Sequence, residues 1–232
     1  MIHLRKLSFT FLLSMSSAIA SAQFHFVNDK DGYTNIRIAG GTGEKIVDTL
    51  RNGHLVYGME RKGNWVNIDY SRKNKDLNGW IYADRIELVT DLPMFDKKSE
   101  SQNQVVLQMA SIRIIVSQQK FNRANYKLSY YKESPGNIEF INGKQYWGTD
   151  GEQPKMEYGP IQILFGKKKV TLPKLAVDNL FQPTLASLLA NYDKENDILY
   201  IQSSNSDGAG YYEVIWKIER GVYKDRYIVY GF

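Results

Sequence analysis

The 232-residue chain contains no cysteine and only three histidines. Without cysteine it has no disulfide, thiolate metal site, thiol nucleophile or acylated cysteine of the lipoprotein type. His25 and His54 are the histidines outside the N-terminal apolar segment. Two are too few for a multi-histidine metal centre, and neither stands in a motif typical of a catalytic triad. We therefore expect no metal and no catalytic site built on cysteine or histidine.

The sequence also lacks an apolar run of the roughly 20 residues that span a bilayer. Its apolar N-terminal run, Leu7 to Met15, follows Arg5 and Lys6 and precedes the small-residue site Ala20-Ser21-Ala22. This order predicts a signal peptide over residues 1–22 and a mature chain that begins at Gln23. We expect a periplasmic or secreted protein without stable membrane insertion. The alternative is an uncleaved first segment that anchors the chain.

The excess of basic over acidic residues is also small. The formal net charge is +5, and it decreases by two when Arg5 and Lys6 leave with the signal peptide. Basic residues gather in residues 71–75 and 166–169, which we interpret as solvated hairpin turns. Export and the small charge excess argue against nucleic acid as a partner. No glycine-rich phosphate-binding motif with its lysine occurs, so no cofactor is indicated.

Aromatic residues and short strand patterns are abundant. The chain has 16 tyrosines, 10 phenylalanines and four tryptophans. Between residues 24 and 90, short strand-like segments alternate with Gly, Asn and Asp turns, and this pattern predicts a mainly β fold that begins with a small barrel. The alternation in residues 65–68 places Val66 and Ile68 in the core and Trp65 nearer the surface.

The first domain carries a family resemblance. The stretches that carry it are Asp31-Gly32-Tyr33-Thr34-Asn35-Ile36-Arg37, the Gly53 turn, Gly63-Asn64-Trp65-Val66 and Asn78-Gly79-Trp80-Ile81. Over about residues 26–90 the chain resembles a bacterial SH3-like domain, the type often called SH3b. The resemblance implies a small barrel in an exported protein that acts at the cell envelope.

Three aromatic residues are the candidate ligand-binding residues of this barrel. We expect Tyr33, Trp65 and Tyr82 to line one groove, because aromatic platforms with a polar tip are common where short peptides or sugars are held. The alternative is that such aromatics cover a thin core, which applies most to Trp80.

Residues 91–104 combine Pro93 with the polar string Ser99-Glu100-Ser101-Gln102-Asn103-Gln104, a composition that predicts a linker. We therefore expect residues 24–90 and 105–232 to fold separately. Residues 105–232 again show strand patterns and form a β-rich C-terminal domain. Leucines at helical spacing between residues 175 and 189, divided by Pro183, predict an insertion of two short helices.

Two glycine-rich bends in the C-terminal domain, residues 146–151 and 206–212, supply the candidate partner-binding residues Trp147, Asp150 and Asp207. Such bends let backbone approach a partner closely, although tight hairpin geometry alone also explains the glycines. The second bend and its surroundings resemble the C-terminal part of poorly characterised exported bacterial proteins, from which no activity can be transferred.

Together these patterns favour a non-enzymatic exported protein whose SH3-like module recognises a peptide or a cell-wall component such as peptidoglycan. One alternative is a periplasmic immunity-type inhibitor of a toxin, in which case the partner is a protein at the envelope. Another is a cell-wall hydrolase that uses paired carboxylates. The acidic residues that we expect in loops, and that would serve such a hydrolase, are Asp150, Glu152, Glu157 and Asp207.

Overall fold

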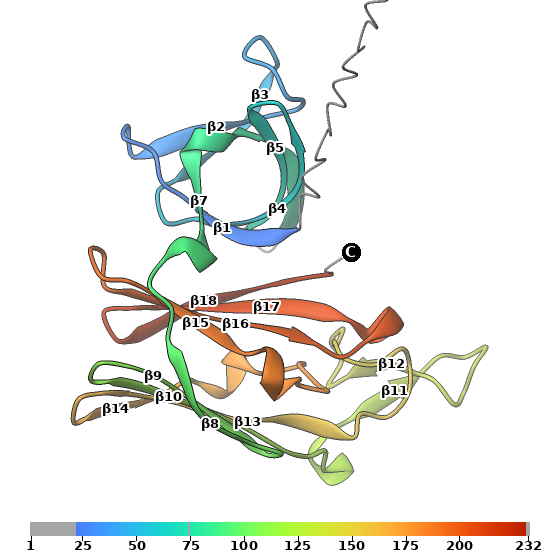
Figure 1. Ribbon diagram of the computed structural model, residues 1–232. Helices are drawn as coiled ribbons and strands as arrows, with labels where there is room; N and C mark the ends of the chain where they lie inside the picture. Colours follow the sequence, from blue (N-terminus) through green and yellow to red (C-terminus); the bar gives the residue numbers. More distant parts are fainter. Residues whose placement is uncertain (1–21, 74, 231–232) are drawn as a thin grey trace, which may run out of the picture.

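The computed structural model describes residues 22–73 and 75–230, so the predicted signal peptide lies outside the described residues except for Ala22. The described chain is mainly β, as predicted, and its sheets lie in three stacked layers (Figure 1). A curled, barrel-like sheet forms the first layer. A four-stranded sheet forms the middle layer, and a five-stranded sheet forms the third.

The barrel-like sheet has seven strands in the order β3-β2-β6-β5-β4-β1-β7. Its strands are β1 (Gln23–Val27), β2 (Tyr33–Arg37), β3 (Ile46–Arg51), β4 (Leu55–Lys62), β5 (Trp65–Arg72), β6 (Lys75–Tyr82) and β7 (Ile86–Leu88). Alternate side chains point into the barrel, where Ile36, Leu50, Val56, Ile68 and Ile81 are at most 1% exposed. The expectation that Val66 and Ile68 belong to the core is confirmed.

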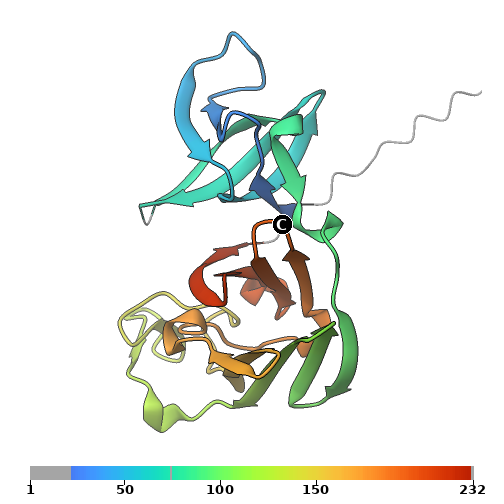
Figure 2. The ribbon, with the colours of Figure 1, turned by 90° about the vertical axis from the view of Figure 1, so that its left-hand side faces the viewer.

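The C-terminal part is a sandwich of two antiparallel sheets (Figure 2). The five-stranded sheet has the order β14-β13-β10-β9-β8, and a separate pair joins β11 to β12. These strands are β8 (Asp96–Ser101), β9 (Gln104–Met109), β10 (Ile112–Lys120), β11 (Leu128–Tyr130), β12 (Ile138–Ile141), β13 (Met156–Phe165) and β14 (Lys168–Thr171). The four-stranded sheet runs in sequence order through β15 (Leu189–Asp193), β16 (Ile198–Asn205), β17 (Tyr212–Glu219) and β18 (Val222–Val229).

The four-stranded sheet is buried on both faces. On one face Ile201, Val214 and Trp216 join the core shared with the five-stranded sheet. On the other face Tyr200 and Ile215 pack in a second apolar cluster against the barrel. Because neighbouring residues of one strand point to opposite faces, the apolar run Ile198–Ile201 supplies both cores from four consecutive positions.

The barrel docks on this sheet through apolar and polar contacts. Phe24, Phe26 and Tyr57 of the barrel lie in the same apolar cluster as Tyr200, and the rings of Phe26 and Tyr200 stack with centroids 5.8 Å apart. At its edge, the Tyr57 hydroxyl donates to a Glu213 carboxylate oxygen over 3.0 Å. Barrel and sandwich therefore share a core. The prediction of two separately folding units did not include such a shared core.

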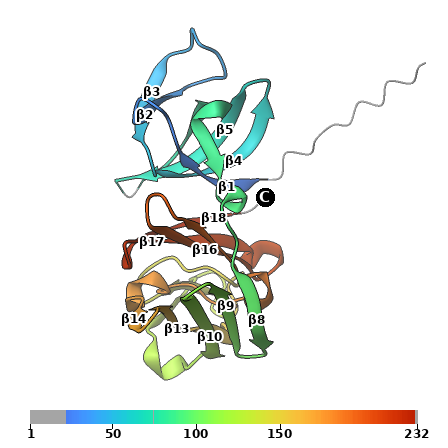
Figure 3. The same cartoon turned by 60° about the vertical axis from the view of Figure 1, so that its left-hand side comes forward.

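The structure differs from the predicted linker of residues 91–104. Met94 forms an antiparallel bridge with Asn191, and the Phe95 amide donates to the Ala190 carbonyl over 2.9 Å, so this segment pairs with β15. Residues 96–101 then form β8, which runs antiparallel to β9 at the edge of the five-stranded sheet (Figure 3). The segment that connects the barrel to the sandwich is thus part of two sheets.

The predicted helical insertion is reduced to short 3₁₀ turns at Lys174–Ala176 and Leu185–Ser187. Leu180 and Leu188 of this segment are at most 1% exposed, whereas Leu175 is 60% exposed. Leu180 and Leu188 fill the space between the two sheets individually, and Pro183 cannot continue a helix.

Candidate binding site

The outer surface of the barrel carries a row of partly exposed aromatic side chains on β5 and β6. Trp65 and Tyr82 are directly opposite each other in the antiparallel register, and their ring centroids are 5.3 Å apart with planes at 86°. Trp80 occupies the next outward position on β6, because outward side chains alternate along a strand. The structure therefore brings together two of the three predicted ligand-binding residues.

Arg37 and the loop that follows it complete this surface. The Arg37 guanidinium carbon lies 5.9 Å from the centroid of the Trp65 ring, within cation–π range. A Cβ built on Gly40 would lie 3.0 Å from Trp65 Cβ and 3.2 Å from Trp80 Cε3. The backbone at Gly40 therefore touches both indoles and leaves little space for a side chain. We call Arg37, Trp65, Trp80 and Tyr82 the aromatic face.

Amide side chains lie next to the aromatic face. Asn64 Nδ2 donates to the Tyr82 hydroxyl over 3.0 Å. Asn67, on the outward side of β5, exchanges side-chain hydrogen bonds of 3.0 Å with Asn78 on β6. Asn67 Nδ2 also donates to the Gly79 carbonyl, and Asn78 Nδ2 also donates to Asp69, so each side chain keeps only an acceptor position on its Oδ1. Rings beside such acceptors suit a peptide backbone or a sugar that donates hydrogen bonds.

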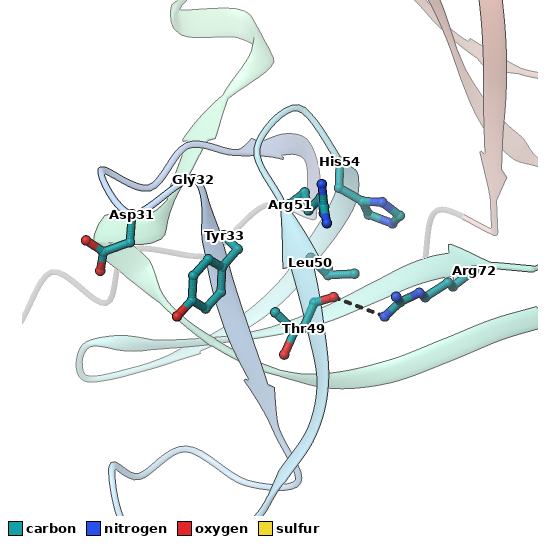
Figure 4. Close-up of a pocket in the computed structure, with 8 residues that line it drawn as sticks. All are labelled: Asp31, Gly32, Tyr33, Thr49, Leu50, Arg51, His54 and Arg72. Atoms are coloured by element: carbon teal, nitrogen blue, oxygen red, sulfur yellow. Dashed lines mark hydrogen bonds between the residues drawn. The ribbon is translucent and has the colours of Figure 1, made fainter.

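Tyr33 does not lie beside Trp65 and Tyr82, so the three predicted ligand-binding residues do not line one groove. It is 50% exposed at the opposite end of β2 from Arg37, and it lines a separate hollow of about 720 Å³. Figure 4 shows Arg51, His54 and Arg72 around the same hollow. The sequence assigns none of these three residues to a site, because Arg51 and Arg72 come from strands, and His54 from a turn, whose arrangement the sequence does not specify.

Arg72, one of the two arginines that line this hollow, is already engaged. Arg72 donates to the Thr49 carbonyl over 3.0 Å and forms an ion pair with Asp48. Burial lowers the pKa of His54, and the positive charges of Arg72 and Lys217 lower it further. The imidazole is therefore held in its neutral form, and the hollow offers fewer free positive groups than its lining residues would suggest.

The two glycine-rich bends of the sandwich meet at one end of it. Ser206 Oγ donates to the Gly148 carbonyl over 2.8 Å. A Cβ on Gly210 would lie only 3.0 Å from Gly148 backbone atoms, so the two bends are in direct contact. Glycine at position 148 has a φ of +112°, which other residues rarely adopt.

This end of the sandwich also carries the three predicted partner-binding residues. Trp147 and Asp150 line a hollow of about 280 Å³. Asp150 and Asp207 line a neighbouring hollow of about 410 Å³. Asp150 and Asp207 are exposed, whereas the Trp147 ring packs against Tyr230 at 4.3 Å between centroids. Part of the Trp147 surface is therefore committed to packing.

Three of the four acidic residues expected in loops lie together, and the fourth lies in a strand. Asp150, Glu152 and Asp207 line the same hollow. Glu157 is instead part of β13 and is 5% exposed, so its expected loop position is wrong. Strand pairing with β10 and a bridge to Phe181 hold it inside the fold.

No protein-family model, curated protein or solved structure matches the chain. Within residues 22–73 and 75–230, no group of three or more His, Asp or Glu side chains is arranged to hold a metal ion. The described part of the chain also contains no helix of the length and apolarity needed to cross a membrane.

Proposed function

We propose that the protein is a non-enzymatic binding protein of the bacterial envelope, and that its aromatic face holds an extended peptide or a peptidoglycan component. The observation that carries this proposal is the contiguous surface of Trp65, Trp80 and Tyr82, with Arg37 beside it. The assignment to the envelope rests on the predicted signal peptide and on the SH3-like sequence pattern.

The rigidity of the aromatic face supports this role. Trp65 and Tyr82 are fixed on adjacent paired strands rather than on loops, so little conformational entropy is lost when a ligand stacks on them. Asn67 and Asn78 supply side-chain carbonyl oxygens as acceptors beside the rings, since their Nδ2 groups already donate within the protein. A ligand with alternating apolar and hydrogen-bonding groups, such as a peptide or a glycan, matches that pattern.

A second candidate function has its own support at the end of the sandwich where the two glycine-rich bends meet. Asp150, Glu152 and Asp207 line one hollow next to the two touching bends. Such an acidic, glycine-rich end suits contact with a basic cleft on another protein. This arrangement favours an immunity-type inhibitor that would occupy the active site of a toxin delivered to the envelope.

One experiment separates these functions. The chain from Gln23 onward is incubated with purified insoluble cell wall, and the bound, free and released material is measured after centrifugation. Our proposal predicts saturable retention of the intact protein without release of wall fragments. Absence of retention, together with tight capture of one envelope protein through Asp150 and Asp207, would support the inhibitor. Release of soluble fragments would indicate a hydrolase.

A further inference from the structure

The sandwich contains a hollow of about 370 Å³ that neither proposed function uses. It lies between β13 and the segment around the 3₁₀ turn Lys174–Ala176. Apolar side chains of Ile161, Val177 and Leu180 line it together with the polar groups of Tyr126 and Glu157. Its volume is within the range of small-molecule sites, which combine apolar walls with a few placed polar groups.

Glu157 is the buried polar group of this hollow. It is 5% exposed, and its two carboxylate oxygens accept hydrogen bonds from Gln119 Nε2 over 2.7 Å and from the Tyr126 hydroxyl over 2.6 Å. Each carboxylate oxygen has two acceptor positions, so both retain the capacity for a further hydrogen bond.

Tyr126 holds this arrangement in place. Its ring stacks on Phe121 with centroids 4.7 Å apart and meets Phe181 edge-on at 5.6 Å. Burial raises the pKa of Tyr126, and its hydrogen bond to Glu157 raises it further. The phenol therefore remains protonated and donates to the carboxylate.

The carboxylate of Glu157 has no cationic partner within the described residues, where the ion pairs involve other groups. Two charged residues also line the hollow. Asp178 is paired with Lys144 over 3.0 Å, and Lys174 is exposed. A buried carboxylate without a paired cation is energetically costly, so this hollow favours a ligand that brings a positive charge.

We propose that this hollow is a binding site for a small organic amine. The ammonium group would donate to the free acceptor positions of Glu157, and its apolar body would lie against Val177 and Leu180. An ammonium group next to the Tyr126 ring would add a cation–π contact, and a ligand ring there would add an aromatic contact. The site depends on neither the aromatic face nor the signal peptide, so it can be tested independently of the proposed function.

The test compares 2-phenylethylamine with the uncharged 2-phenylethanol, two probes of similar size and shape. Each is titrated into the chain from Gln23 onward, and binding is followed by NMR shifts of the Val177 and Leu180 methyl groups. Ligands with so few atoms bind in the millimolar range or somewhat tighter. We expect the amine to bind at least about tenfold more tightly than the alcohol, since only the amine pairs with Glu157.

Variants locate the effect. Glu157→Gln should remove the preference for the amine, whereas Asp84→Asn, a change of an exposed carboxylate in the barrel, should leave it intact. Lys174→Ala should tighten amine binding because it removes a like charge. Thr171→Trp adds a bulky side chain at an exposed lining position and should weaken both probes without unfolding the protein, as checked by circular dichroism.

The proposal is overturned if the amine and the alcohol bind equally, or if neither shifts the methyl resonances at millimolar concentration. It is also overturned if Thr171→Trp and Lys174→Ala leave amine binding unchanged. If Glu157→Gln is unfolded, these two surface variants still decide the outcome.

Discussion

Two histidines of the barrel connect its stability to pH. Burial is the largest cause that lowers the pKa of His25 and of His54 from the ordinary value of 6.5. The folded state therefore binds fewer protons than the unfolded state in the interval just below this value. Their contribution to stability is complete above the unfolded pKa and is lost as the pH falls through 6.5 towards the folded pKa.

We expect the midpoint of urea unfolding to decrease between about pH 7.5 and about pH 5.5, the window in which histidines titrate. The His25→Gln/His54→Gln double variant is the control, and its midpoint should change less over the same interval. An unfolding midpoint that rises on acidification, or an equal decrease in the double variant, would contradict this assignment.

At the scale of elements, the crossing of β2 and β6 sets a strict size limit at Gly79. A Cβ at this position would clash with Ile36 Cγ2 and would lie 3.1 Å from the Arg37 carbonyl oxygen. Both neighbours belong to β2, whose only register contact with β6 pairs Arg37 with Trp80. The absence of a side chain at Gly79 therefore lets the two strands approach and close the curled sheet.

Gly79→Ala should destabilise the barrel by about 1–3 kcal/mol, the usual cost of overfilling a packed position. Gly43→Ala is a suitable control, because a Cβ there would meet no atom within 4 Å. Chemical denaturation of both variants measures the difference. Equal stability of the two variants would show that β2 moves away without cost.

Local sequence patterns predicted the barrel strands better than the connecting elements. The alternation of Trp65, Val66 and Ile68 is sufficient to predict which side chains are buried, because this strand has one buried face and one more exposed face. β8 was missed because all six of its residues are exposed. An edge strand without a buried face has no apolar alternation, so its polar composition is the same as that of a linker.

The partial prediction of the binding residues has a similar cause. The outward position of Trp65 follows from strand alternation, and its contact with Tyr82 follows from the β5–β6 hairpin, which is local in sequence. The position of Tyr33 depends on how β2 pairs with β3 and where β5 ends, and these contacts join distant segments. The burial of Glu157 likewise depends on pairing between β10 and β13.

At the scale of the whole molecule, the middle sheet connects the barrel to the third layer. The run Ile198–Ile201 is continuously apolar, a pattern typical of a strand covered on both faces. This run is the sequence feature that could have predicted a middle layer. Lys217 on the barrel side of the sheet donates to the Gly53 carbonyl over 2.8 Å. Burial lowers the pKa of Lys217, as expected for an ammonium group enclosed between layers.

This architecture predicts that the isolated fragment 24–90 is less stable than the barrel in the full chain. Phe24, Phe26 and Tyr57 are at most 5% exposed in the full chain and lose their partners in the fragment. Each large apolar side chain contributes about 1.5–3 kcal/mol when fully buried, so a loss of several kcal/mol is expected. Thermal unfolding of the fragment and of the chain from Gln23 onward measures it.

The variant Phe26→Ser serves as the matched control for this comparison. It should destabilise the full chain strongly and the fragment much less, because Phe26 packs on Tyr200 of the middle sheet. A fragment that unfolds at the same temperature as the barrel in the full chain would contradict a shared core and would restore the interpretation of two independent domains.

The variant Trp65→Ala tests whether the aromatic face is the binding surface. Retention on purified cell wall and thermal unfolding are measured for this variant and for the control Tyr130→Ala, which removes a 43% exposed tyrosine of the sandwich.

Truncation of an anchor residue costs on the order of 2 kcal/mol of binding or more. Loss of a core tryptophan would instead cost about 3–5 kcal/mol of stability. We expect Trp65→Ala to reduce retention at least about tenfold and to change unfolding little, whereas Tyr130→Ala should change neither. Unfolding of the Trp65 variant, or unchanged retention while Trp147→Ala or Asp207→Ala abolishes it, would show that the aromatic face is not the binding surface.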